Sequence, residues 1–318
     1  MKKLLLVCLV MLGCGGSTSG EDAGQDSTAP DGGGPDSAKI DSGKDGSDGA
    51  IDDGSSNDAV SDAGNDGGSM GDGGFDVGNV SGLVLWLDAA KGVTKNNQNQ
   101  VSAWADQSSA KNNAAQSTGS LQPVYNASVI NGLPAMRFDK GNTIGRMLIV
   151  TDAASLQWGT GDFLVEVVSR FDNSPSFAGD GIAAFYFKTG SNAGVVLVGN
   201  AVDTNMMSVA AGITGATGPQ DILPFKGSYN DSAARGYAFH RTGQTLELRV
   251  NGAQVGTKAQ SSNIDVSVSG NDVFIGSNQN GGNLRMNGDI AEIIAVKGSV
   301  SAQDLSSIEA YLKAKYNL

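Results

Sequence analysis

Short apolar runs, each followed by a polar and glycine-rich segment, occupy the last three quarters of this chain of 318 residues. Between residues 246 and 250, apolar positions alternate with Glu247 and Arg249, which is typical of a strand with one buried face. The run 163–171 is apolar on both faces for most of its length, as a central strand would be. Further strands are predicted at 81–88, 183–187, 194–198, 237–240, 273–276 and 290–296.

Turns and one helix complete the pattern. Asn251-Gly252 supplies the pair with positive φ that a type I′ hairpin turn requires, and Thr242-Gly243 stands between two predicted strands. At the C-terminus, Ser301 and Asp304 have the form of a capping box with Asp in place of Glu. Apolar residues then repeat at helical spacing, at Leu305, Ile308, Tyr311 and Leu312. This order of elements predicts an all-β fold, an antiparallel β-sandwich with one short C-terminal helix.

Charge divides the chain near residue 78. The net charge is −12: residues 17–78 contribute −13 and residues 79–318 contribute −1, while Lys2 and Lys3 add +2. The acidic segment holds 16 Gly, 14 Asp and 10 Ser. Because this composition cannot bury enough apolar surface to offset its ordering entropy, we expect a disordered acidic linker with a span of roughly 45 Å. The nearly neutral domain gives no indication of a nucleic-acid partner.

The first residues predict export. Lys2 and Lys3 precede an apolar run at 4–12, which is half the length of the roughly 20 residues that a transmembrane helix needs and is typical of a secretory signal. Met11-Leu12-Gly13-Cys14 resembles the lipobox of bacterial lipoproteins, which implies cleavage after Gly13 and a lipid on Cys14. Secretion without a lipid is the alternative. The predicted divisions are a signal peptide at 1–13, a lipidated N-terminus and tether at 14–78, and a folded domain at 79–318.

Cysteine usage agrees with this interpretation. Cys8 and Cys14 are the two cysteines, and a mature chain would keep only Cys14. We therefore expect no disulfide within the chain, no cysteine nucleophile and no cysteine metal site. Gly15 does not resemble the aspartate retention signal of enteric lipoproteins, which favours the outer membrane of the bacterial cell envelope.

Nine segments of the folded part form a recognisable series: 82–89, 101–108, 112–114, 123–125, 131–135, 137–139, 246–252, 288–294 and 310–316. Together they resemble bacterial laminin G-like domains. The resemblance implies a concanavalin A-like jelly roll of two packed antiparallel sheets. It leaves activity open, because this fold carries lectins, adhesion modules, enzyme appendages and some hydrolases.

Calcium is the one cofactor to consider. In the linker, Asp41, Asp45 and Asp52 fit three positions of an EF-hand loop, but Gly43 fills a ligand position and no helices flank the segment, which favours a plain tether. The laminin G-like resemblance implies a calcium ion at the edge of the sandwich. Its candidate ligands include Asp139, Asp162 and Asp289, and no contiguous signature selects among them.

An enzyme is the least favoured interpretation. Glycosidases of this fold carry carboxylates two or three residues apart on one strand, whereas Glu166 stands alone on its strand and Asp289 faces away from Glu292. His240 is the only histidine, and no nucleophile-elbow motif accompanies it, so we expect a packed or surface residue.

A binding site is predicted from aromatic, amide and carboxylate side chains in loops. Trp158 lies between Gln157 and Gly159 and is the most loop-like of the three tryptophans. Two polar segments, 212–236 and 276–288, are interpreted either as solvated connections or as the place of a ligand site. The candidate ligand-binding residues are Trp158, Tyr229, Asn230, Asp231, Asn278 and Asn280.

Glu292 shares the apolar face of its predicted strand and must therefore be paired or hydrated. It either lines a groove or pairs with a base such as Arg137 or Arg285, and pairing is favoured.

These observations favour a lipid-anchored envelope protein that presents a non-catalytic binding module. A polysaccharide or glycoconjugate is the first ligand class. A surface protein partner is the second hypothesis, and an unrecognised glycoside hydrolase is the third.

Overall fold

A computed structural model describes residues 75–139, 141, 144–172, 182–189, 194–203, 206–215, 220–227, 229, 231–260, 262–277 and 285–318. The predicted signal peptide, Cys14 and the linker as far as residue 74 lie outside the described residues. The folded part already includes Phe75, whose ring contacts Tyr311, and Val77, which is buried. Folded structure thus begins at least four residues before the predicted boundary at residue 79.

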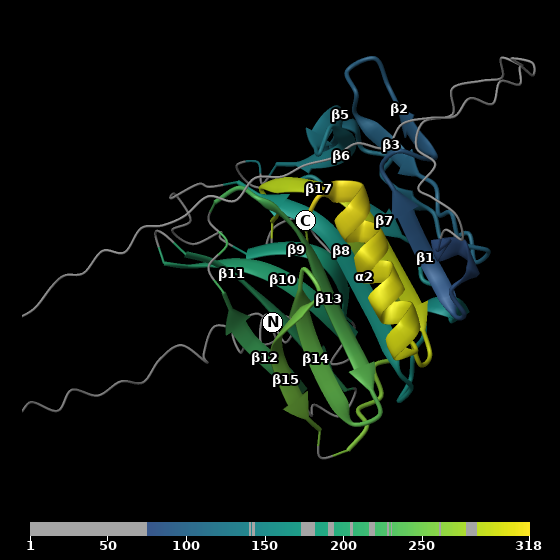
Figure 1. Cartoon of the computed structure of the whole chain (residues 1–318). Coiled ribbons are helices and arrows are strands. Elements are labelled where there is room, and N and C mark those ends of the chain that lie inside the picture. Colours follow the sequence, from purple (N-terminus) through teal and green to yellow (C-terminus); the bar gives the residue numbers. More distant parts are fainter. Residues whose placement is uncertain are drawn as a thin grey trace, which may run out of the picture. The chain divides into compact units, whose positions relative to one another are not determined.

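Within the described residues, the strands form two antiparallel sheets (Figure 1). The eight-stranded sheet has the spatial order β15 (Ala253–Ala259), β14 (Thr245–Val250), β13 (Ala234–Thr242), β8 (Phe163–Phe171), β17 (Gly288–Lys297), β6 (Leu133–Phe138) and β5 (Val124–Ile130), with β1 (Leu83–Asp88) also paired to β17. The nine-stranded sheet has the order β12 (Gln220–Lys226), β11 (Met206–Thr214), β10 (Gly194–Asp203), β9 (Ile182–Thr189), β16 (Val273–Ile275), β7 (Leu148–Val150), β4 (Ala114–Ala115), β3 (Val101–Trp104) and β2 (Val93–Lys95). The predicted all-β sandwich is confirmed.

One apolar core lies between the sheets. Each sheet turns alternate residues of its strands into the same cluster of buried side chains, for example Phe163 and Phe239 from the eight-stranded sheet and Trp104 and Leu197 from the nine-stranded sheet. The central strand β8 is buried on both faces, as its apolar run predicts, with Val165 facing this core.

A second apolar cluster covers the outer face of the eight-stranded sheet. Helix α2 (Ala302–Tyr316) lies along this face and packs Ile308 and Leu312 against Leu164 and Val168 of β8 (Figure 1). The helix begins where predicted, because the Ser301 side chain accepts a hydrogen bond from the Asp304 amide at 3.0 Å.

The opening segments of the laminin G-like resemblance have a structural role at strand β1. Asp106 accepts hydrogen bonds from the backbone amides of Trp86, Ser108 and Asn112, at 2.7–2.8 Å. The Asn112 amide group donates to the Val84 carbonyl at 2.7 Å. This loop therefore covers the free edge of β1, which would otherwise offer unpaired backbone groups to another chain.

The hairpin turn at Asn251-Gly252 follows the predicted turn chemistry, whereas one predicted loop is wrong. Asn251 and Gly252 have φ angles of 48° and 75° between β14 and β15, as a type I′ turn requires. The segment 212–236, interpreted as a polar connection, instead contains the end of β11, all of β12 and the start of β13. Leu223, which is buried in the inter-sheet core, draws β12 into the sheet.

Candidate functional site

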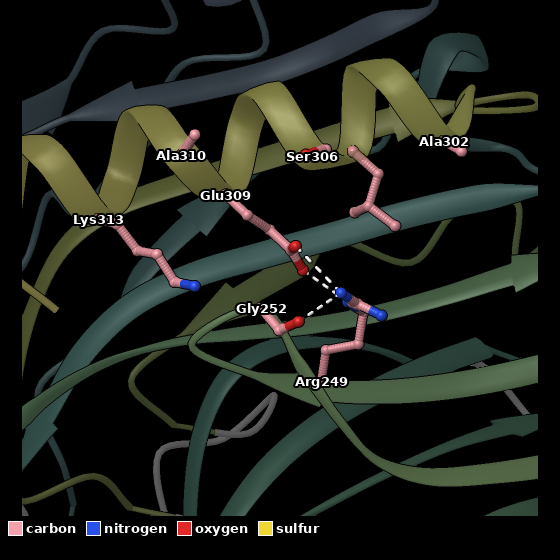
Figure 2. A pocket seen from close by; sticks show the side chains of 8 residues that line it. Arg249, Gly252, Ala302, Ser306, Glu309, Ala310 and Lys313 are labelled. Atoms are coloured by element: carbon pink, nitrogen blue, oxygen red, sulfur yellow. Dashed lines mark hydrogen bonds and ion pairs between the residues drawn. The ribbon is translucent and has the colours of Figure 1, made fainter.

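A pocket of about 430 Å³ opens between helix α2 and the β14–β15 hairpin (Figure 2). The helix contributes residues at intervals of three or four, which places them on one face along three turns. Two further residues come from strand β14 and from the turn that follows it. The lining consists of Ala302, Leu305, Ser306, Glu309, Ala310, Lys313, Arg249 and Gly252.

An ion pair fixes the wall of this pocket. Arg249 donates to both carboxylate oxygens of Glu309, at 2.6 and 3.1 Å, and to Glu247 at 2.7 Å. It also donates to the backbone carbonyl of Gly252, so the hairpin turn is held against the helix (Figure 2). The hydrogen bond to Glu309 raises the pKa of Arg249, and its guanidinium is a permanent cation.

Two other polar groups of the pocket are not engaged. In the part of the chain that the structure describes, neither the Lys313 ammonium nor the Ser306 hydroxyl has a hydrogen bond or ion pair, and both residues are exposed. Figure 2 shows Lys313 one helical turn beyond Glu309, with its ammonium directed toward the hairpin turn at Gly252. The pocket thus combines a fixed ion pair with a cation and a hydroxyl that can receive a ligand.

A buried carboxyl group lies beside this charged wall. Glu166 shares a cross-strand row with Ala238 and Arg249, and its Oε2 has no hydrogen-bond partner among the described residues. Burial and, secondly, the negative charge of Glu309 raise the pKa of Glu166 from 4.5 to about 8. Glu166 therefore carries its proton near neutral pH.

His240 lies on the same outer face, opposite Glu247. Its Nε2 is 3.7 Å from Glu247 Oε1, longer than a hydrogen bond, and burial lowers the pKa of the imidazole. The histidine is thus a packed and neutral side chain near neutral pH, as its setting in the sequence favours.

Glu292 is paired, but not with either predicted arginine. Its carboxylate accepts hydrogen bonds from Trp86 Nε1 at 2.6 Å, Tyr316 Oη at 2.8 Å and Lys315 Nζ at 2.7 Å, and from the Tyr311 hydroxyl at 3.1 Å. Burial raises the pKa of Glu292. Since three of these partners come from α2, the carboxylate anchors the helix to the sheet.

Asp88 completes this anchor. It lies directly opposite Glu292 on the neighbouring strand and accepts from the same Lys315 ammonium at 2.9 Å. This carboxylate pair is closed by its lysine and is not open to a substrate. Arg137 instead pairs with Asp172 and, at 3.3 Å, with Asp289.

Trp158 does not lie exposed in a loop. Its side chain is 5% exposed and belongs to the inter-sheet core, where its ring stacks on Phe163 at a centroid distance of 4.9 Å. The expectation of an open ring is therefore corrected, because the apolar surface of a tryptophan is better buried than solvated. No face of this ring is free to stack on a sugar.

Tyr229 and Asp231 lie in one cluster. The Arg235 guanidinium is 4.8 Å from the centre of the Tyr229 ring and binds the Asp231 carboxylate at 2.6 Å. The hydrogen bond from Arg235 lowers the pKa of Asp231. Tyr229 is half-buried and meets Tyr237 edge-on at 5.9 Å, so this cluster is an ion pair capped by an aromatic ring. The other candidates, Asn230, Asn278 and Asn280, lie outside the described residues.

The described part of the chain holds no group of three or more His, Cys, Asp or Glu side chains that could bind a metal ion. The candidate calcium ligands have other contacts. Asp162 accepts from the Gly243 amide at 2.7 Å, Asp289 binds Arg170 at 2.7 Å, and Asp139 accepts from the Gly141 amide at 3.0 Å. Among the described helices, none has the length and apolar character to cross a membrane.

The pocket residues were missed in the sequence. The alternating pattern of 246–250 places Glu247 and Arg249 on a polar face, and the helical spacing places Lys313 near the end of a helix. Neither pattern predicts that the polar face of the strand contacts the helix face that carries Lys313. That contact depends on how α2 lies on the sheet.

Comparisons with solved structures show similar folds in several binding domains. The binding domain of Paraclostridial Mosquitocidal Protein 1 matches with a TM-score of 0.56 and 12% identity, over 76% of this chain and 54% of that one. The receptor binding domain of botulinum neurotoxin D matches with a TM-score of 0.51 and 10% identity, over 74% and 54%. That of botulinum neurotoxin mosaic serotype C/D gives 0.51 and 11%, over 74% and 52%.

The chain therefore spans about half the length of the structures that it matches. At these identities the likeness defines the class of fold, a β-sandwich of the kind found in binding domains. No protein-family model matches the sequence, and no curated protein matches it.

Proposed function

We propose that this chain is a lipid-anchored protein of the bacterial cell envelope that presents a non-catalytic, laminin G-like module for binding a polysaccharide or glycoconjugate. One observation carries the proposal: a pocket with both fixed and unengaged polar groups lies on the outer face of the sandwich. Saccharide ligands are recognised through hydroxyl and charged groups, which such a lining can meet with hydrogen bonds.

Two further features support binding over catalysis. The similar folds are described as binding domains, and the carboxylate pair of Asp88 and Glu292 is held closed by Lys315. A glycosidase needs two carboxyl groups on either side of an accessible sugar, at about 5–10 Å.

The test is a glycan and polysaccharide array probed with the chain from residue 14 onward, carrying Cys14→Ser so that it remains free of lipid. Each array is run with calcium and again with a chelator. Retention of a defined set of glycans supports the proposal, and loss of retention in chelator would add calcium as a cofactor. An array without retention, from protein whose circular dichroism shows a folded β-sandwich, contradicts glycan binding and favours a protein partner.

The anchor is tested separately. A lipid on Cys14 predicts that the full chain fractionates with the outer membrane and incorporates labelled fatty acid. Cys14→Ser should abolish both the label and the membrane association, because the lipid is the proposed attachment. An unlabelled wild-type chain that is released into the medium would contradict the anchor and support plain secretion.

A further inference from the structure

We propose that the pocket between α2 and the β14–β15 hairpin takes an acidic saccharide and that Lys313 binds the carboxylate of a uronate residue. This inference rests on the proposed function and narrows it to one ligand class and one site. It starts from the charges that line the pocket.

The two cations of the pocket lining differ in their partners. Arg249 is matched by Glu309 and Glu247, at 2.6 and 2.7 Å. Lys313 has no ion pair within the described residues and is exposed in the last turn of the helix. The negative end of the helix dipole favours a cation at this position.

Gly252 gives this ammonium its place. A β-carbon at residue 252 would lie 2.9 Å from Lys313 Nζ and 3.1 Å from Glu309 Oε2, and the φ angle of 75° also disfavours any side chain. Because Gly252 has no side chain, the Lys313 ammonium can lie close to the Glu309 carboxylate of the Arg249–Glu309 pair.

The remainder of the lining suits a sugar ring. Ala302 and Ala310 are small and exposed, so they leave room for a ring beside this face of the helix. Leu305 is half-buried and offers an apolar contact. Ser306 adds a hydroxyl that can both donate and accept. The volume of about 430 Å³ lies within the range of roughly 300–1,000 Å³ typical of small-molecule sites.

The ligand must carry isolated rather than dense negative charge. A charge-assisted hydrogen bond from Lys313 to a carboxylate is about twice as strong as a neutral one, which favours an acid over a neutral sugar. Glu309 and Glu247 would repel a second negative group placed along the same wall. A saccharide in which uronates alternate with neutral residues meets both conditions.

The experiment measures calorimetric binding to the Cys14→Ser chain of hyaluronan oligosaccharides, in which uronate alternates with a neutral residue, and of alginate and polygalacturonate oligosaccharides, in which every residue is a uronate. Each is measured beside its carboxyl-reduced counterpart. We expect the hyaluronan oligosaccharide to bind about fivefold or more tightly than its reduced form, and more tightly than the two fully charged oligosaccharides. Lys313→Gln should remove that advantage and the accompanying salt dependence while leaving the affinity for the reduced form unchanged.

Two variants complete the design. Lys111→Gln removes an exposed lysine outside the pocket and should leave every affinity unchanged. Ser306→Trp fills the pocket from an exposed helical position and should abolish binding without loss of the folded circular dichroism spectrum.

The outcomes separate this inference from the proposed function. If the acidic and reduced forms of a glycan bind with equal affinity, or if Lys313→Gln binds the acidic form as tightly as the wild type does, the inference is wrong and the proposal of glycan binding is unaffected. Absence of binding to this panel overturns the inference, and silence on the wider glycan array as well overturns the proposed function.

Discussion

The two faces of the eight-stranded sheet are covered by different elements, the inner face by the second sheet and the outer face by helix α2. The inner face meets the second sheet through side chains such as Phe163, Phe239 and Leu248, and its buried cluster is apolar. The outer face meets helix α2 through Leu164 and Ile308, and charged groups are interspersed with that apolar contact.

The difference separates stability from recognition. An apolar interface is stabilised by burial alone and can be filled by any well-packed set of side chains. A buried charge requires a partner at a defined position, so the helix is held in one register by the bonds of Lys315 to Glu292 and Asp88. That register places the α2 residues that line the pocket opposite Arg249.

The inner face should show the largest effect of a single substitution. Phe163→Ala removes a ring that is 1% exposed and packs against both Trp158 and Phe239. We expect a loss of about 3–5 kcal/mol in the free energy of unfolding, measured by urea denaturation. Ser306→Ala on the exposed helix surface is the control and should change stability by less than about 0.5 kcal/mol. A loss below about 1 kcal/mol for Phe163→Ala would contradict the described core.

The outer face should respond nearly as strongly when its cation is removed. Lys315→Met leaves the buried Glu292 without its cation, while Asp88 keeps Lys91 at 4.0 Å. We expect a loss of about 3 kcal/mol in the free energy of unfolding at neutral pH. Adding Glu292→Gln should restore part of this loss, because the amide needs no counter-ion. Equal stability of Lys315→Met and wild type in the same denaturation series would refute the anchor.

The pH dependence of stability isolates Glu166. Its folded pKa of about 8 lies above the ordinary value of 4.5, so the folded chain keeps a proton that the unfolded chain releases. Stability should therefore fall as pH rises from about 4.5 to about 8, by up to about 1.4 kcal/mol per pH unit from this group, and level off above. Glu166→Gln should remove that component of the slope. Parallel stability curves for the variant and the wild type would show that Glu166 is ionised in the folded state.

The smallest effect is expected at the start of the helix. Ser301→Ala deletes the side chain that accepts from the Asp304 amide, and should cost about 1 kcal/mol. Ser301→Asp, which keeps a capping oxygen, should retain most of the wild-type stability. Thermal unfolding of the two variants side by side distinguishes the cap from a general effect of the position.

Local patterns predicted the fold well. The apolar run 163–171, the pair Asn251-Gly252 and the capping residues at Ser301 each specify a conformation through neighbouring residues alone, and each is found in the structure. Strand β12 was missed because Pro224 interrupts its short apolar run at 222–225. Its place at the edge of the nine-stranded sheet is where proline is tolerated.

The candidate site depended on contacts between distant segments and was not predicted. Glu292 was expected to pair, yet its partner Lys315 is 23 residues away on a helix whose register no local pattern defines. Trp158 has loop-like neighbours, but Phe163 lies close enough to draw its ring into the core. Judged from its own segment alone, each of Arg249 and Lys313 has the sequence pattern of an ordinary surface residue. Only the packing of the helix beside the hairpin places them in one pocket.

Hydrogen–deuterium exchange of the Cys14→Ser chain, with and without a retained glycan, would locate the binding site on the sandwich. A site between α2 and the β14–β15 hairpin predicts slower exchange in the turn at 249–254 and in the helix at 302–313, with Lys313→Gln reducing the protection. Protection confined to the nine-stranded sheet, with the helix and the hairpin unchanged, would contradict a binding site on the outer face beside α2.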